Sequence, residues 1–301
     1  TTLPYVNADP HIGFALEILQ ADVLARHASL SGREVFFNTG TDEHGQKIFE
    51  TAQKAGRDAQ EYVDYYASEF KKLKDALGLS SSLHFIRTTE PRHIEAAQEM
   101  WKRCAANGDI YKKAYEGLYC VGCEKFLTQK EIVDGKCHIH GKEPVLLKEE
   151  NYFFKFSEYQ EKLLQYLNRT DVVIPEWRRQ EAINFVKEGL EDFSISREKA
   201  RLSWGVPVPG DDTQVMYVWF DALTSYISTL GWPNEGGDFE KFWQEGHVLQ
   251  MAGKDQIRFQ SLIWQAMIMS AGVKNTDQVF YHGFINSGGQ KMSKSLGNVI
   301  N

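Results

Sequence analysis

Short apolar runs alternate with amphipathic segments near both ends of this 301-residue chain. Residues 10–31 repeat apolar side chains at helical spacing, and residues 35–38 follow as a short buried strand. Further helices are expected at 44–55, 58–77, 91–107, 221–230 and 255–271, and further strands at 215–220, 247–252 and 279–282. Strands separated by helices favour a parallel sheet that is covered on both faces. The sequence therefore predicts an α/β protein with a doubly wound parallel sheet.

The alternation is interrupted in the middle of the chain. Between residues 109 and 191, a cysteine cluster and aromatic strands such as 152–156 take its place. We therefore expect an inserted domain at 109–191, which separates a first half of the sheet domain at 1–108 from a second half at 192–301.

Composition excludes several classes of protein. The formal net charge is −7, whereas a protein that mainly grips phosphate backbones carries a basic surface, so any nucleic-acid contact must use a local patch. No apolar run is long enough to span a membrane, and residues 1–5 lack the features of a secretory signal. We therefore expect a cytoplasmic protein that has no membrane partner.

Three of the four cysteines lie in one short stretch together with histidine. The pairs Cys120-x2-Cys123 and Cys137-x2-His140 each predict a tight knuckle, and together they supply four ligands of the kind that Zn²⁺ binds tetrahedrally. The alternatives are a disulfide or free thiols, and His138 is a rival imidazole at similar spacing. A site closed by four protein ligands predicts structural zinc that organises the insert and performs no chemistry.

The segment around His11 joins an extended stretch to the first expected helix. A helix start presents unpaired N–H groups and the positive end of the helix dipole, which favour phosphate, and Gly13 allows a ligand close to the backbone. His11 can donate to a phosphoryl oxygen as charge develops there. Taken alone, the same pattern also fits a histidine that caps or packs against the helix.

Two lysines three residues apart, Lys291 and Lys294, lie among glycines and serines near the other end of the chain. A cationic loop of this kind can close over a triphosphate and neutralise a pyrophosphate leaving group, although a solvated basic turn has the same composition. We expect this loop and the His11 segment to meet at the carboxyl edge of the parallel sheet, where open α/β folds bind ligands.

Both segments resemble motifs of a known class of enzymes. His11-Ile12-Gly13-Phe14 resembles the HIGH motif of class I aminoacyl-tRNA synthetases, with Phe14 at the usual second histidine, and residues 291–295 match their KMSKS motif at every position. Stretches that resemble the methionyl-tRNA synthetase family in particular are 3–7, 40–45, 204–209 and 217–222. The resemblance implies a Rossmann-type sheet that is interrupted by an inserted zinc-binding connective domain with one knuckle.

The resemblance also implies the residues of a substrate site. The side chains that would bind methionine are Leu3, Tyr5, Asp42, Trp219, Ala222, Tyr226 and Gln260. The residues that would bind ATP are Gly13, Phe14, Glu17, Gly253, Asp255, Lys291 and Lys294, and the two lysines would act in catalysis with His11. Apolar and aromatic walls suit a thioether, and the Asp42 carboxylate would hold the α-ammonium group. On pattern alone, the three aromatic residues also fit the protein core.

The reaction implied by the resemblance is activation of L-methionine by ATP, with Mg²⁺, to methionyl-adenylate and pyrophosphate. Transfer of methionine to the 3′ end of tRNA(Met) would follow. We expect a monomer, and we expect the anticodon-binding domain of such synthetases to be absent from this chain. The alternatives are a class I synthetase for another amino acid, a small-molecule nucleotidylyltransferase and a non-catalytic zinc-knuckle module that binds RNA.

Overall fold

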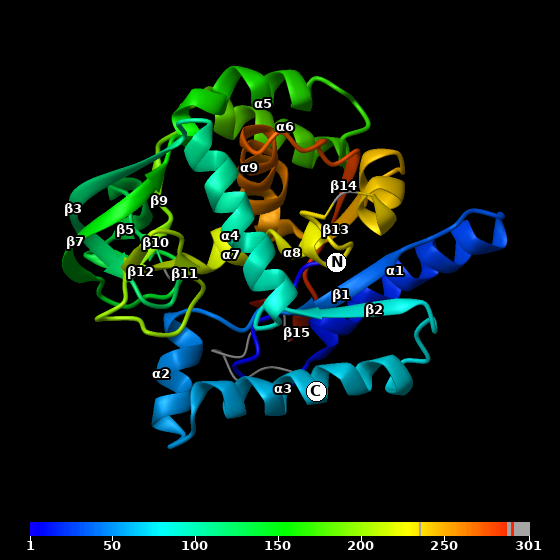
Figure 1. Ribbon diagram of the computed structural model, residues 1–301, viewed down its shortest axis with the longest axis horizontal. Helices are drawn as coiled ribbons and strands as arrows, with labels where there is room; N and C mark the ends of the chain where they lie inside the picture. The colour runs from blue at the N-terminus through cyan, green and yellow to red at the C-terminus, as the bar shows by residue number, and fades with distance from the viewer. Residues whose placement is uncertain (124, 235, 288–289, 292–301) are drawn as a thin grey trace.

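The computed structural model describes residues 1–123, 125–234, 236–287 and 290–291. Its parallel strands form two sheets near the middle of the molecule (Figure 1). In one sheet, β1 (Phe37–Thr41) pairs in parallel with β2 (Leu83–Arg87). In the other, β14 (Gln278–His282) pairs in parallel with both β13 (Leu249–Gly253) and β8 (Val173–Ile174). These parallel ladders, with helices between the strands, confirm the predicted α/β class.

Four helices lie before, between and after β1 and β2 in the first third of the chain. Their bounds are Ile12–Leu30 for α1, Gln46–Lys54 for α2, Ala59–Ala76 for α3 and Pro91–Ala106 for α4. Asp58 caps α3 by accepting from the N–H groups of Gln60 and Glu61, and α4 begins with proline, which has no N–H to leave unpaired. All four helices were predicted from the sequence to within a few residues.

An antiparallel lobe occupies the left side of Figure 1, away from α1. Its centre is the long hairpin of β3 (Ile110–Cys120) and β7 (Val145–Phe154), which pair from Ile110 with Phe154 to Tyr119 with Val145. The shorter strands of the lobe are β4 (Lys125–Phe126), β5 (Ile132–Val133), β6 (Lys136–Cys137), β9 (Phe193–Ser194), β10 (Ser196–Glu198), β11 (Pro207–Val208) and β12 (Asp211–Met216). The one-turn helix η1 (Gln129–Glu131) precedes β5. Strands β3 to β7 lie within the predicted insert, whereas β9 to β12 follow it in the sequence, and the boundaries 109 and 191 stay predictions.

The segment after β7 returns to the body of the molecule. It forms η2 (Phe156–Tyr159), α5 (Gln160–Leu167) and α6 (Glu176–Lys187), which lie at the top of Figure 1 beside α9 (Trp264–Ser270). Leu163 and Ala182 are buried in the same apolar core as Trp264 and Val279. Strand β8 therefore forms the edge of the C-terminal sheet, and the helices α5 and α6 share its core.

Several elements differ from the sequence-based expectation. Strands β2 and β8 were not predicted, and β1 begins at Phe37 and not at residue 35. The predicted strand 215–220 ends at Met216, and the short helices α7 (Val218–Ala222) and α8 (Ser225–Ser228) follow. A fully apolar run does not distinguish a buried strand from a buried helix, because neither shows a polar face. The predicted helix 255–271 is divided into η4 (Lys254–Gln256), the π-helical η5 (Arg258–Ile263) and α9, and η3 (Phe239–Gln244) is also π-helical.

A second apolar core lies between α1 and α3, and it includes Val6, Phe14 and Phe70. The N-terminal segment joins this region because Tyr5 forms a parallel bridge with Asp42, directly beyond β1. Near the other end, β15 (Asn286–Ser287) pairs with β16 (Gln290–Lys291). Among the described residues, no helix is both long and apolar enough to cross a membrane.

Candidate active site and metal centre

The four predicted metal ligands come together at the tip of the antiparallel lobe. The ligand atoms of Cys120, Cys123, Cys137 and His140 all lie within 4.8 Å of one another. The Cys123 Sγ is 3.6 Å from the Cys137 Sγ and 3.2 Å from the His140 Nδ1. These separations approach the roughly 3.5–3.8 Å between ligands of a tetrahedral zinc ion, and the sulfurs are too far apart for a disulfide. The set can therefore hold a metal ion.

The surroundings of the cluster favour His140 over His138 as the fourth ligand. The His138 Nδ1 lies 3.0 Å from the carbonyl oxygen of Glu131, to which it can donate. Gly122 allows the His140 ring to approach, because a Cβ at this position would meet the ring at 2.7 Å. The small core of this tip consists of Leu127, Ile132 and the three cysteines themselves, so the ligand cluster makes up most of this core.

Replacing Cys137 with serine is expected to weaken zinc binding by more than about 100-fold, because even losing a group that only orients a ligand costs 10- to 100-fold. The tip is also expected to lose amide-exchange protection, since its core contains the ligands. Zinc content by mass spectrometry and hydrogen exchange measure both effects. Cys104→Ser is the matched control, because Cys104 is buried in the main core outside the cluster. Equal zinc content in both variants would contradict the assignment.

His11 caps the first helix with its side chain. Its Nδ1 accepts a hydrogen bond of 3.1 Å from the N–H of Gly13, so the proton of the neutral ring belongs on Nε2. The ring of Phe14, by contrast, is buried and meets Phe70 edge-on, with 5.5 Å between ring centroids. The Phe14 ring therefore packs into the core and does not face a ligand at the helix start.

The carboxyl ends of β13 and β14 lie against the first turns of α1. Gly253 ends β13 and pairs with His282 at the end of β14, whose Nε2 lies 3.0 Å from a Glu17 carboxylate oxygen. Glu17 follows His11 by six residues, which is about 9 Å along a helix. Asp255 follows Gly253 in η4, and a Cβ on that glycine would meet the Asp255 Oδ1 at 2.8 Å. The residues predicted to bind ATP on these elements are thus neighbours.

The Glu17 carboxylate is bound by other residues of the protein. The Glu17 side chain is buried, and one carboxylate oxygen accepts from both the N–H and the hydroxyl of Thr2 at 2.7 and 2.6 Å. Its other oxygen faces His282, whose Nδ1 lies 2.8 Å from the carbonyl of Gly283. Both nitrogens of the His282 ring therefore face acceptors, which favours the doubly protonated ring. His282 was not predicted as a site residue, although it ends the predicted strand 279–282.

The stability of the protein is expected to depend on pH through His282. Burial disfavours its charge, but the Glu17 carboxylate and the Gly283 carbonyl outweigh burial and raise the pKa above the ordinary 6.5. A raised pKa contributes stability below pH 6.5 that is lost as pH rises through the folded-state value. His282→Gln should therefore flatten this fall, as measured by urea unfolding between pH 6 and 9. An identical slope in wild type and variant would contradict the pairing.

The residues predicted to bind methionine are also brought together. Trp219 of α7 stacks on Phe259 of η5, with ring centroids 3.8 Å apart. Gln260, the next residue of η5, donates a hydrogen bond to the hydroxyl of Tyr226, and both side chains are buried. Burial raises the pKa of the Tyr226 phenol, which therefore stays neutral at physiological pH. Ala222 is buried on α7 one turn after Trp219.

The backbone of Asp42 and the nearby side chain of His44 connect Asp42 with these residues. The N–H of Asp42 donates to Pro4 O at 3.0 Å, and Asp42 pairs with Tyr5, so the segment that contains Leu3 runs beside it. His44 Nδ1 lies 2.7 Å from a carboxylate oxygen of Asp221, which is on α7. Asp42 and the α7 wall are thereby connected through buried side chains.

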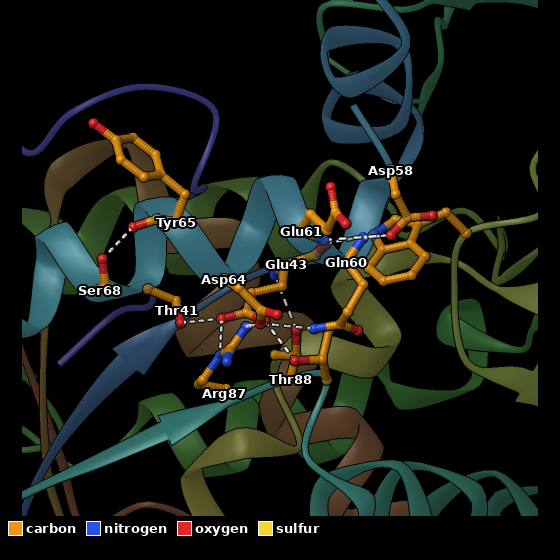
Figure 2. A network of polar contacts seen from close by, with 12 residues as sticks. Thr41, Glu43, Asp58, Gln60, Glu61, Asp64, Tyr65, Ser68, Arg87 and Thr88 are labelled. Atoms are coloured by element: carbon orange, nitrogen blue, oxygen red, sulfur yellow. Dashed lines mark hydrogen bonds and ion pairs between the residues drawn. The ribbon is translucent and has the colours of Figure 1, made fainter. Parts of the chain in front are cut away.

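Glu43, between Asp42 and His44, lies in a polar network (Figure 2). Arg87 binds its carboxylate with two hydrogen bonds of 2.7 and 2.9 Å, and the hydroxyls of Thr41 and Thr89 donate to it at 2.5 Å each. Neither Glu43–Arg87 nor His44–Asp221 was assigned from the sequence. The available signal was a run of ionisable residues directly after a buried strand.

Of the two predicted catalytic lysines, one lies within the described residues. Lys291 belongs to β16 and pairs with Asn286, while Lys294 lies outside the described residues. Their predicted contacts with a triphosphate stay predictions.

An α/β body with an antiparallel lobe, a histidine-capped helix at the ends of its parallel strands and a Cys₃His centre defines the catalytic fold of a class I aminoacyl-tRNA synthetase. The family model described as tRNA synthetases class I (M) matches residues 1–137 and 128–301. The chain therefore belongs to the methionyl family of class I tRNA synthetases.

Individual relatives agree with this family. The methionine–tRNA ligase of Fusobacterium nucleatum subsp. nucleatum is 44% identical over 303 residues, which cover all of this chain and 47% of the relative. That of Mesorhizobium japonicum is 46% identical over 306 residues, covering 100% of this chain and 58% of the relative. Mycobacterium tuberculosis methionyl-tRNA synthetase in complex with methionyl-adenylate superposes with a TM-score of 0.93 at 42% identity, over all of this chain and 59% of that chain. The chain spans about half the length of the curated relatives it matches.

Proposed function

We propose that this chain activates L-methionine with ATP and serves the charging of tRNA(Met). The observation that carries the proposal is the convergence of Asp42, α7 and η5 in a chain that superposes on a synthetase described with methionyl-adenylate. A carboxylate beside aromatic and apolar walls is suited to an amino acid with an uncharged, polarisable side chain.

In the proposed reaction, Asp42 holds the α-ammonium group of methionine. Leu3, Tyr5, Trp219, Ala222, Tyr226 and Gln260 enclose the thioether side chain. The methionine carboxylate attacks the α-phosphorus of ATP in line, an oxygen–phosphorus bond forms, and the bond from the α-phosphorus to the bridging oxygen breaks. Pyrophosphate leaves with that oxygen. The chain thus mainly positions the reactants and stabilises charge, as is usual in phosphoryl-type transfer.

The nucleotide would lie at the start of α1 and the ends of the parallel strands. His11 donates from Nε2 to a phosphoryl oxygen, the positive end of the α1 dipole near Gly13 and Phe14 attracts the phosphates, and Asp255 binds the ribose beside Gly253. Glu17 supports this region through His282, and Lys291 and Lys294 neutralise the departing pyrophosphate. Mg²⁺ bound with ATP would supply further positive charge.

We also propose that the metal of the Cys₃His cluster is zinc, which suits thiolate and imidazole ligands at these separations. Four protein ligands leave no open position for substrate, so the zinc is structural.

After activation, the acyl group of the adenylate passes to the 3′ end of tRNA(Met).

Amino-acid-dependent exchange of pyrophosphate into ATP tests the proposal. Exchange should depend on methionine and be at least about 100-fold weaker with leucine, isoleucine or valine, because both pocket shape and sulfur contacts discriminate. Stronger exchange with one of the other amino acids would favour a different class I synthetase. Exchange with none of them, despite ATP binding by calorimetry, would favour a nucleotidylyltransferase.

A further inference from the structure

A buried carboxylate joins the two halves of the proposed amino-acid pocket. One oxygen of Asp221 accepts a 2.7 Å hydrogen bond from the Nδ1 of His44, and the other accepts a 2.6 Å bond from the Nε2 of His93. The hydroxyl of Ser228 lies 2.9 Å from the remaining nitrogen of His93, to which it can donate. Asp221 and His93 are 0% exposed and His44 is 4% exposed, so water takes little part.

These residues come from four separate elements. His44 lies in the turn after β1, His93 on α4, Asp221 on α7 and Ser228 on α8. The bond from His44 to Asp221 spans 177 residues of sequence. It therefore joins the part of the chain that carries Asp42 to the part that carries the aromatic wall.

The position of Asp221 in the sequence gives this connection its importance. It lies between Trp219 and Ala222 on the five-residue helix α7, and His44 lies two residues after Asp42. A shift of Asp221 would move both wall residues relative to the carboxylate that is proposed to hold the substrate ammonium. Burial would raise the pKa of the Asp221 carboxyl, but the two imidazoles lower it to about 2, so the group is ionised.

A second buried clamp holds the turn from its other side. The Glu43 carboxylate is bound by Arg87, its N–H donates to the Thr88 hydroxyl at 2.9 Å, and the Trp204 indole N–H donates to its carbonyl at 2.6 Å. The turn that carries Asp42 is therefore fixed by one clamp at Glu43 and another at His44. Gly45 follows with a φ of +104°, a conformation that favours glycine and ends the turn.

Stability alone does not explain a carboxylate buried between two imidazoles. Well-packed apolar side chains in place of a buried charged group are often equally stable or more stable, because burial removes the hydration of the charge. Directional bonds of this strength instead fix geometry, which matters most next to a site that must bind its ligand within about 0.5 Å.

We propose that Asp221, with His44 and His93, is a positioning group that sets the distance between Asp42 and the α7 wall and so determines affinity for the amino-acid substrate. This role rests on the proposed function. It predicts a selective effect on methionine, because His44 follows Asp42 by two residues and Asp221 lies between Trp219 and Ala222 on α7, all on the proposed amino-acid side of the site.

The test compares the KM values for methionine and ATP in pyrophosphate exchange by the zinc-loaded chain. Asp221→Asn should raise the KM for methionine by roughly 10- to 100-fold, because misplacement by about 1 Å can have effects of this size. The KM for ATP should change less than about twofold. Asp109→Asn is the matched control, since Asp109 is also a buried carboxylate and accepts from Tyr159 and Ser270, away from the site.

A pair of variants at His44 makes the test independent of whether Asp221→Asn folds. In His44→Asn the amide nitrogen can take the place of Nδ1 and still donate, whereas His44→Leu cannot donate. The KM for methionine should therefore rise much less in His44→Asn than in His44→Leu. Calorimetric methionine binding and circular dichroism accompany the kinetics.

The possible results separate the two proposals. Absence of methionine-dependent exchange in the wild-type chain would overturn the proposed function. Normal wild-type exchange, with KM for methionine unchanged in folded Asp221→Asn or equal in the two His44 variants, would overturn only the positioning role. Equal increases in both KM values would also overturn it, since a general loss of structure has that signature.

Discussion

Asp42→Asn is expected to lower kcat/KM for methionine by about two to four orders of magnitude, with little change in the KM for ATP. Asp42 is 2% exposed, so a substrate ammonium beside it would be largely removed from water. Removing one partner of a buried ion pair typically costs about 3–5 kcal/mol. Asparagine keeps the shape of the side chain but removes the charge, so the loss reports on the ammonium contact.

Pyrophosphate exchange at varied methionine and varied ATP measures this effect. Asp58→Asn is a suitable control, because Asp58 caps α3 and asparagine caps helices about as well as aspartate. Wild-type kinetics for methionine in Asp42→Asn would remove Asp42 from the proposed site, whatever the behaviour of the other residues.

Arg87→Met is expected to destabilise the protein by about 3–5 kcal/mol, because it leaves the Glu43 carboxylate buried without its main counter-charge. The Glu43 side chain is 0% exposed, and the two residues share two hydrogen bonds (Figure 2). Methionine fills a similar volume, so the loss of charge pairing dominates over the loss of packing.

Denaturant unfolding near neutral pH measures this difference in the free energy of unfolding. Arg92→Met provides the comparison, since Arg92 forms an ion pair with Glu90 in which the side chains are 51% and 30% exposed. Exposed pairs contribute about 0–1 kcal/mol, so the control should be nearly neutral. Equal effects at both positions would show that the Glu43 network is not the stabilising element inferred from the structure.

Features that depend on nearby residues could be predicted from the sequence. The helices α1, α3 and α4 follow from apolar spacing and from Asp58 and Pro91 at their starts. The metal cluster follows from two short knuckles, each of which places two ligands side by side. In both cases the pattern that allows the prediction lies within a short stretch of sequence.

Features that depend on distant residues could not be predicted in this way. The apolar run 215–220 has no polar face, so its periodicity does not show the change from strand to helix after Met216. The partners Asp221 of His44 and Arg87 of Glu43 lie far along the chain, and the sequence offers many acceptors to the one and many donors to the other. Similarly, the pattern that places Phe14 at a helix start does not show that its ring meets Phe70.

The pairing of β8 with β14 bears on how the antiparallel lobe could be shortened. Excising all of 109–191 would also take the edge strand from the C-terminal sheet and Leu163 and Ala182 from the main core. Trimming only the tip, from residue 121 to residue 144, would spare the register of Tyr119 with Val145 and the rest of the β3–β7 hairpin, and would remove the 3.4 Å ion pair of Glu131 with Arg258. The length of the lobe can therefore vary at the end that carries the ligand cluster, whereas its base belongs to the main core of the molecule.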